Sequence, residues 1–123
     1  MCGVSDCLVN SNKLDWEYTQ IANHLFSQTG SVTINKTLNN YKELLFMVSY
    51  GNNLYTTSQI LTVGFVYNGR ILTFSKYSSD PNYAYEISIK LTNVTASSFV
   101  INIAEFSKGS ALTNTFKLDL LGR

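Results

Sequence analysis

The chain has 123 residues, enough for one domain that buries a hydrophobic core without the help of a disulfide or a metal. Its formal net charge is +1 and it has no run of Lys or Arg, which argues against nucleic-acid binding and against attachment to an anionic membrane. Aromatic residues make up 13% and charged residues 14% of the chain, a balance that favours β-strands and contact surfaces.

The first residues are mostly small or polar. We expect residues 1–13 to form a lead-in segment, with disorder as one alternative, ahead of a single β-sandwich domain in residues 14–123. A signal-peptide pattern and a long apolar run are both absent, so we expect synthesis in a cytosol and no membrane insertion. Cytosolic thiols stay reduced, which argues against a disulfide between Cys2 and Cys7, and two sulfurs without a nearby His do not predict a zinc site.

Residues 19–26 are compatible with a short helical turn or with a first strand, and the sequence does not choose between them. The only His of the chain, His24, lies in this stretch. Its sequence neighbours include no second His, paired carboxylate or nucleophile, so we expect a surface or interface residue and not a catalytic one.

The chain is organised around residues 38–50, which contain an unbroken apolar run at residues 44–48. Turn signals stand on both sides of this run, which is too short for a lone buried helix, so it predicts a strand covered on both faces, in the centre of a sandwich or at a subunit interface. Before it, residues 31–36 alternate apolar and polar side chains, as a half-buried strand does. After it, residues 54–66 predict one or two further strands, broken near Gly64.

The dipeptide Asn68-Gly69 stands between two apolar runs, which is a strong hairpin signal. It predicts that residues 71–74 pair antiparallel with residues 62–66. The next segment, residues 78–82, contains the only Pro among turn-forming residues and predicts a loop.

Three further strands are predicted in the last third of the chain. Residues 85–92 alternate strictly between apolar and polar side chains, which predicts one buried and one exposed face. Residues 99–103 form another apolar run, and residues 107–110 predict a tight connection. The last strand covers residues 116–120, with its apolar side chains on one face.

These elements add up to seven or eight strands joined by short turns, without a convincing long helix or an internal repeat. We therefore predict an all-β fold: an antiparallel β-sandwich of two packed sheets, of jelly-roll or another Greek-key type.

The sequence offers little that predicts catalysis. The acidic residues are scattered singly, so we do not expect Glu43, Asp80, Glu86 or Glu105 to pair for acid–base chemistry. There is no glycine-rich phosphate loop, nucleophile elbow or cluster of metal ligands. We predict a protein that is not an enzyme and that has no cofactor or metal.

Tyr and Asn recur together in the predicted turns. An aromatic ring offers a flat apolar face to a sugar ring, and a neighbouring Asn, Asp or Arg can bind the hydroxyl groups. The alternative is structural, because Asn and Gly suit positive φ and Tyr fills strand ends and interfaces. The candidate ligand-binding residues are Tyr50, Asn52, Asn53, Tyr55, Tyr67, Asn68, Arg70, Tyr77, Asp80, Asn82 and Tyr83.

A longer motif carries a resemblance to a known family. The motif is Gly30-Ser31-Val32-Thr33-Ile34-Asn35-Lys36-Thr37-Leu38-Asn39-Asn40-Tyr41-Lys42-Glu43-Leu44-Leu45-Phe46, preceded by Trp16-Glu17 and followed at the end of the chain by Leu121-Gly122-Arg123. With these residues, nearly all of the chain after about Leu14 resembles the carboxy-terminal domain of tail-fibre or baseplate structural proteins of bacteriophages and prophages of Gram-positive bacteria. The chain departs from that family in lacking a long fibre stem.

The resemblance implies a compact β-sandwich that forms a homotrimer at the distal end of a fibre. It implies other phage tail proteins and a host cell-wall glycan as partners, and location in the virion tail after assembly in the host cytoplasm. The family supplies no fixed set of binding residues, so the candidate residues rest on the turns alone.

Low charge and high aromatic content also favour burial between copies of the chain. We expect a homotrimer with residues 44–48 or residues 99–103 near its axis. Two other functions remain open: a virion assembly domain that binds only other tail proteins, and a carbohydrate-binding module of a secreted enzyme.

Overall fold

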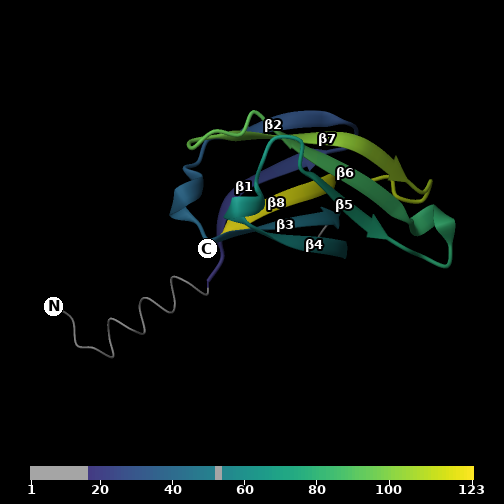
Figure 1. Ribbon diagram of the computed structural model, residues 1–123. Helices are drawn as coiled ribbons and strands as arrows, with labels where there is room; N and C mark the ends of the chain where they lie inside the picture. The colour runs from purple at the N-terminus through teal and green to yellow at the C-terminus, as the bar shows by residue number, and fades with distance from the viewer. Residues whose placement is uncertain (1–16, 52–53) are drawn as a thin grey trace, which may run out of the picture.

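The computed structural model describes residues 17–51 and 54–123, and in these residues eight strands form two antiparallel sheets (Figure 1). Three single turns of 3-10 helix connect them: η1 (Leu38–Asn40), η2 (Val63–Phe65) and η3 (Pro81–Tyr83). The strands are β1 (Thr19–Phe26), β2 (Gly30–Ile34), β3 (Glu43–Tyr50), β4 (Leu54–Thr62), β5 (Ile71–Lys76), β6 (Tyr85–Thr92), β7 (Phe99–Lys108) and β8 (Phe116–Gly122).

The two sheets lie face to face as the two layers seen in Figure 1. Sheet A has the strand order β1-β8-β3-β4 and sheet B the order β2-β7-β6-β5. The chain crosses between the sheets four times: between β1 and β2, β2 and β3, β4 and β5, and β7 and β8. The predicted all-β sandwich is confirmed, while its jelly-roll or Greek-key type stays a prediction.

The hydrophobic core fills the space between the sheets. It follows from the alternation in the sequence, because every second side chain of a strand points to the same face. In β8, for example, Phe116, Leu118 and Leu120 are buried while the residues between them are half-buried. Burial of a large apolar side chain contributes roughly 1.5–3 kcal/mol. Among the described residues, the four largest fully buried side chains are Phe46, Phe74, Phe99 and Phe116.

The apolar run of residues 44–48 lies in β3, an inner strand of sheet A with β8 on one side and β4 on the other. Its central place in the sheet agrees with the sequence, while cover on both faces is not present within the single chain, and the alternative of a subunit interface stays a prediction. The side chains of Leu44, Phe46 and Val48 are buried against sheet B, whereas Leu45 and Met47 on the outer face are only half-buried. The sandwich covers one face of this strand.

The predicted hairpin between residues 62–66 and residues 71–74 is wrong. Residues 63–65 form η2, and β5 pairs with β6 in the other sheet. The turn at Asn68-Gly69 is present, but it is fixed to the β6–β7 connection: the Gly69 amide donates to the Leu91 carbonyl oxygen at 2.7 Å, and the Asn68 side chain accepts from the Val94 amide at 2.8 Å. Val66 is buried in the core, between β4 in sheet A and β5 in sheet B.

Other differences from the sequence predictions are small. Residues 19–26 form strand β1, which resolves the choice between helix and strand. Strand β7 runs on to Lys108, so part of the connection predicted at residues 107–110 belongs to the strand. Cys2, Cys7 and the rest of the lead-in segment lie outside the described residues.

A polar cluster joins the beginning of β1, the beginning of β3 and the end of the chain. The Tyr18 hydroxyl donates to Glu43 Oε1 at 2.7 Å, and the Arg123 guanidinium pairs with the same oxygen. Arg123 also lies over the Tyr18 ring, 4.7 Å from its centre. Hydrogen bonds from Tyr18 and from Arg123 favour the charged carboxylate and lower the pKa of Glu43 below its ordinary value.

This cluster should make stability depend on pH. Because the folded state lowers the pKa of Glu43, its contribution is present above the unfolded pKa and is lost as the pH falls through the folded pKa. We expect Glu43→Gln to reduce the free energy of unfolding by about 1 kcal/mol at pH 7, since the pair is partly exposed, and the difference from wild type to shrink below about pH 4. Urea titrations at several pH values measure this.

The matched control is Glu105→Gln, which removes an exposed carboxylate from β7. It should stay within about 0.5 kcal/mol of wild type at pH 7. A Glu43→Gln effect that does not change between pH 7 and pH 3 would show that the carboxylate charge is not its cause.

Candidate functional site

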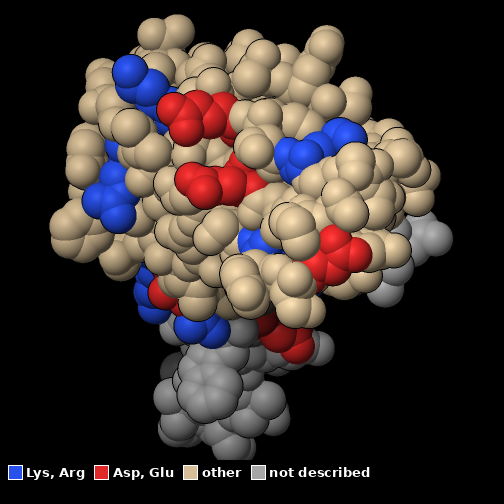
Figure 2. Space-filling model, turned by 90° about the vertical axis from the view of Figure 1, so that its right-hand side faces the viewer, with Lys and Arg blue, Asp and Glu red and all other residues tan. Residues whose placement is uncertain are grey.

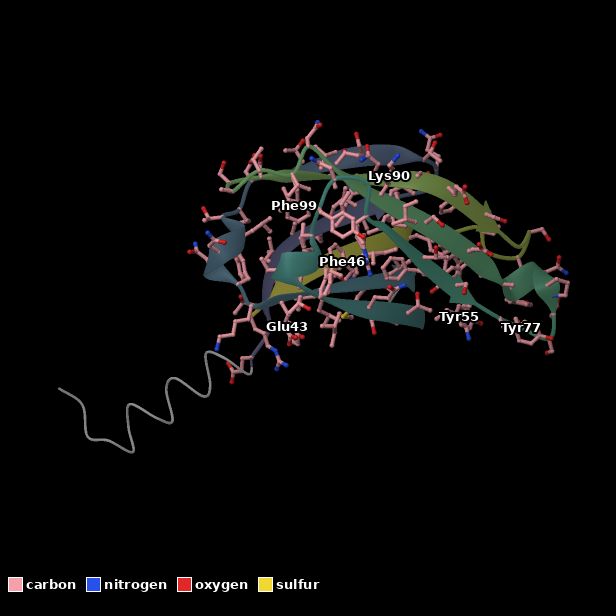
Figure 3. The ribbon with its side chains drawn as sticks, in the orientation of Figure 1. Glu43, Phe46, Tyr55, Tyr77, Lys90 and Phe99 are labelled. Atoms are coloured by element: carbon pink, nitrogen blue, oxygen red, sulfur yellow. The ribbon has the colours of Figure 1, made fainter. Side chains whose placement is uncertain are left out.

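The candidate ligand-binding residues divide between the two ends of the sandwich. We call the end at which β1, β3, β5 and β7 finish the tyrosine end, and the opposite end, which carries Arg123, the terminal end. Figure 3 shows Tyr55 and Tyr77 toward the tyrosine end and Glu43 toward the terminal end. Asn52 and Asn53 lie outside the described residues. The candidates at the tyrosine end are Tyr50, Tyr55, Tyr77, Asp80, Asn82 and Tyr83, and those at the terminal end are Tyr67, Asn68 and Arg70.

At the terminal end the three candidates form a separate group. Arg70 Nη1 donates to the Tyr67 hydroxyl at 3.3 Å, and the guanidinium lies 5.8 Å from the centre of the Tyr67 ring. The Asn68 side-chain oxygen accepts a hydrogen bond from the Val94 amide. These side chains are used in fixing the turn before β5, and the sandwich separates them from the other candidates.

At the tyrosine end, Tyr50 is a core residue. The residue is 8% exposed, and the centre of its ring lies 5.2 Å from that of Phe116. The Asn114 amide donates to the Tyr50 hydroxyl oxygen at 3.0 Å, and this hydrogen bond lowers the pKa of Tyr50 below its ordinary value. For Tyr50 the structure therefore favours the packing role over a contact with a ligand.

Tyr55 has an unusual backbone conformation, with a φ of 54° in the left-handed region that large side chains rarely adopt. Its carbonyl oxygen accepts a hydrogen bond from the Tyr85 hydroxyl at 2.6 Å. Its ring stacks on Tyr50 with 6.2 Å between the ring centres, and the Lys76 ammonium lies 5.0 Å from its centre. Tyr55 is thus held in place from three sides and is still 38% exposed.

The loop around η3 uses the polar atoms of two candidates for its own structure. Asp80 Oδ1 accepts from the Asn82 amide at 3.0 Å and caps η3. The Asn82 side-chain oxygen accepts from the Ser110 hydroxyl at 2.9 Å, and its carbonyl oxygen accepts from the Ala111 amide at 3.0 Å. These bonds tie the β5–β6 loop to the β7–β8 loop.

A groove of about 440 Å³ lies at the tyrosine end, where β5 and β7 finish and β6 begins. Tyr77 forms part of its wall and is 87% exposed, so most of its ring faces solvent. Tyr85 is buried, and that burial raises the pKa of its hydroxyl. The charged residues that line the groove are Lys76, Glu86 and Lys108.

Strand register brings the groove residues together. Residues from three different strands lie side by side here because β6 pairs with β5 on one side and with β7 on the other. One row of register partners is Lys76, Tyr85 and Lys108, and the next is Ser75, Glu86 and Ser107.

The groove combines the groups that a saccharide requires. The exposed Tyr77 ring offers an apolar face, two ammonium groups and the serine hydroxyls can donate hydrogen bonds, and the Glu86 carboxylate can accept them. Sequence reasoning found Tyr77 but missed the three charged residues. The alternation in residues 85–92 places Glu86 on the outer face, whereas Lys76 and Lys108 are register partners of the buried Tyr85, and only the structure shows that all three residues line one groove.

Charge is thinly spread over this end of the molecule. Figure 2 looks onto it and shows acidic and basic groups of both signs scattered across a mainly uncharged surface. Among residues 17–51 and 54–123, no group of three or more His, Cys, Asp or Glu side chains is placed to hold a metal ion. In the same residues no helix has the length and apolar character needed to cross a membrane.

The residues considered for catalysis lie apart from one another or on the surface. Glu43 accepts a hydrogen bond from Tyr18 at the terminal end, and Asp80 caps η3. Glu86 and Glu105 are exposed on neighbouring strands of sheet B, where Glu105 pairs with Ser88, two residues along β6 from Glu86. His24 lies half-buried on β1, in a separate depression, with its ring stacked at 6.3 Å on that of Phe26.

Comparison with known proteins does not identify the chain. No protein-family model matches it, and neither the curated proteins nor the solved structures include a significant match.

Proposed function

We propose that this chain is the tip domain of a phage tail fibre or baseplate and binds a saccharide of the host cell wall through the groove at the tyrosine end. The resemblance of residues 30–46 to such domains supports the tail context. The observation that carries the binding site is the exposed Tyr77 ring in the wall of a groove of about 440 Å³ that Lys76, Glu86 and Lys108 also line.

The proposal includes a homotrimer in the virion, other tail proteins as neighbours, and binding without catalysis. Repetition of a weak site in three copies strengthens attachment, because the second and third contacts become intramolecular. This suits a groove that lies open on the surface and that offers few charged groups to a ligand.

Tyr77→Ala tests the site. The side chain is 87% exposed, so its removal should leave the free energy of unfolding within about 0.5 kcal/mol of wild type. If the ring stacks on sugar, retention of the purified full chain on Gram-positive cell walls should weaken at least tenfold, which corresponds to about 1.4 kcal/mol. A sedimentation assay with purified walls measures the retention.

Tyr67→Ala is the matched control, since Tyr67 is also exposed, at 48%, but lies at the terminal end. It should bind the walls as wild type does. Equal weakening by both substitutions, or by neither, would contradict a saccharide site in this groove.

One observation favours a second candidate function, that of an assembly domain which binds only other tail proteins. The side-chain oxygens of Asp80 and Asn82 are used within the loops at the tyrosine end, as expected if the Tyr and Asn turns are structural. Wild-type chain that is folded and trimeric but not retained on any wall preparation would support this function over saccharide binding.

A further inference from the structure

The outer face of sheet A carries an apolar row that crosses three adjacent strands. Leu45 of β3 stands opposite Leu121 of β8 on one side and Ile60 of β4 on the other. Ile60 is 59% exposed, and Leu45 and Leu121 are half-buried. Met47, the next outward residue of β3, is also half-buried. In residues 17–51 and 54–123 no secondary-structure element covers this face (Figure 1).

The outer face of sheet B is different in character. Its central positions on β6 are Glu86, Ser88 and Lys90, and their partners on β7 include Glu105 and Asn102. Such a face is stable in water. Of the two strands expected near an oligomer axis, this contrast favours β3 over β7.

The charges on the face of sheet A favour a second copy of this chain as its partner. Lys117 and Asp119, both on β8, form an ion pair at 3.4 Å, so the two groups compensate each other. Asp119 stands opposite Met47, beside the apolar row. A surface without an excess of positive or negative charge does not select a strongly acidic or basic partner. The same surface on a second copy of the chain would not repel it.

The size and the edge of the sheet are also compatible with self-association. Four strands of seven to nine residues cover on the order of 450 Å² in projection. A stable interface buries roughly 800 Å² of accessible surface per partner, a measure that exceeds the projected area because side chains stand out from the sheet. The edge strand β4 has no charged residue and no Pro in its nine residues, although these are the usual devices that keep sheet edges apart.

We propose that copies of this chain associate through the outer face of sheet A, with the row Leu121–Leu45–Ile60 at the centre of the contact. The inference rests on the proposed function only for the number of copies, three. The contact leaves the tyrosine end open, because the apolar row lies toward the terminal end of the sheet.

Two substitutions of nearly equally exposed isoleucines test the face. Ile60, on the edge strand of sheet A, is 59% exposed, and Ile71, on the edge strand of sheet B, is 58% exposed. We expect wild type to have three times the monomer mass of 13.8 kDa in light scattering at micromolar concentration. Ile60→Lys should reduce the mass to that of the monomer, and Ile71→Lys should leave it unchanged. Circular dichroism checks that both variants are folded.

Amide hydrogen exchange gives a second measurement that needs no substitution. Exchange in β4 should slow as the concentration of wild type rises, while exchange in β5 should not change. A monomeric wild type, or equal effects of the two lysine substitutions, would overturn the inference. The cell-wall assay separates the proposals: wall binding by a monomeric wild type would reject only the interface, and a trimer without wall binding would reject only the saccharide site.

Discussion

Replacement of Phe116 by alanine is expected to lower the free energy of unfolding by about 3–5 kcal/mol, which is a large part of the total stability of a domain of this size. Phe116 is fully buried at the beginning of β8. Four aromatic rings surround it, with ring centres 5.1–5.9 Å away. These rings belong to Phe26, Tyr50, Tyr85 and Phe106.

The large effect is expected because these rings come from both sheets. Alanine would leave a cavity that neither sheet can close without moving its strands, so the transfer and the cavity contributions add. Tyr85, which lines the groove, packs edge-on against Phe116 at 5.1 Å, so wall binding should fall together with stability. Urea titration followed by circular dichroism measures the first effect and wall sedimentation the second.

Phe65→Ala is the control for this substitution, because Phe65 lies in η2 and is 57% exposed. It should change the free energy of unfolding by no more than about 0.5 kcal/mol. If the two variants lost similar amounts of stability, Phe116 would not be the centre of the aromatic packing.

The second large effect is expected for Gly109→Ala, at the start of the β7–β8 loop. A Cβ at this position would overlap the backbone of Pro81 and Asn82 in the facing loop. The Gly109 amide also donates to the Ala84 carbonyl oxygen at 2.8 Å. Since backbone cannot rotate out of the way as a side chain can, the two loops must separate, and we expect a loss of about 1–3 kcal/mol.

Separation of these loops should also disturb the groove, because Gly109 and Pro81 both line it. We therefore expect Gly109→Ala to weaken cell-wall retention as well as thermal stability. Gly64→Ala is the matched control, since nothing lies within 4 Å of a Cβ at Gly64. A Gly109→Ala variant as stable as Gly64→Ala would show that the loops are not in close contact in solution.

Side-chain alternation is the part of the fold that can be predicted from the sequence. The strands at residues 85–92 and 116–120 bury the apolar positions expected for them, because a period of two in hydrophobicity suits a strand with one covered face. An unbroken apolar run gave a weaker prediction. In residues 44–48 it indicated two covered faces, whereas within the single chain only the inner face is covered.

The pairing of strands is the part of the fold that local sequence patterns did not predict. The Asn68-Gly69 signal correctly indicates a turn, but the strand after it pairs in the other sheet, because Val66 enters the core and the turn is bonded to Leu91 and Val94. A dipeptide signal describes the backbone of the turn alone. It contains no information about which distant strand offers a free edge.

The sequence by itself determined the all-β class, the sides of most strands that are buried, and a set of Tyr and Asn residues concentrated in turns. The tertiary structure alone decided that these turns separate to opposite ends of the sandwich and that Lys76, Glu86 and Lys108 line the same groove as Tyr77. The reason is physical: hydrophobic alternation is a property of neighbouring residues, whereas strand order and register are set by contacts between residues far apart in the chain.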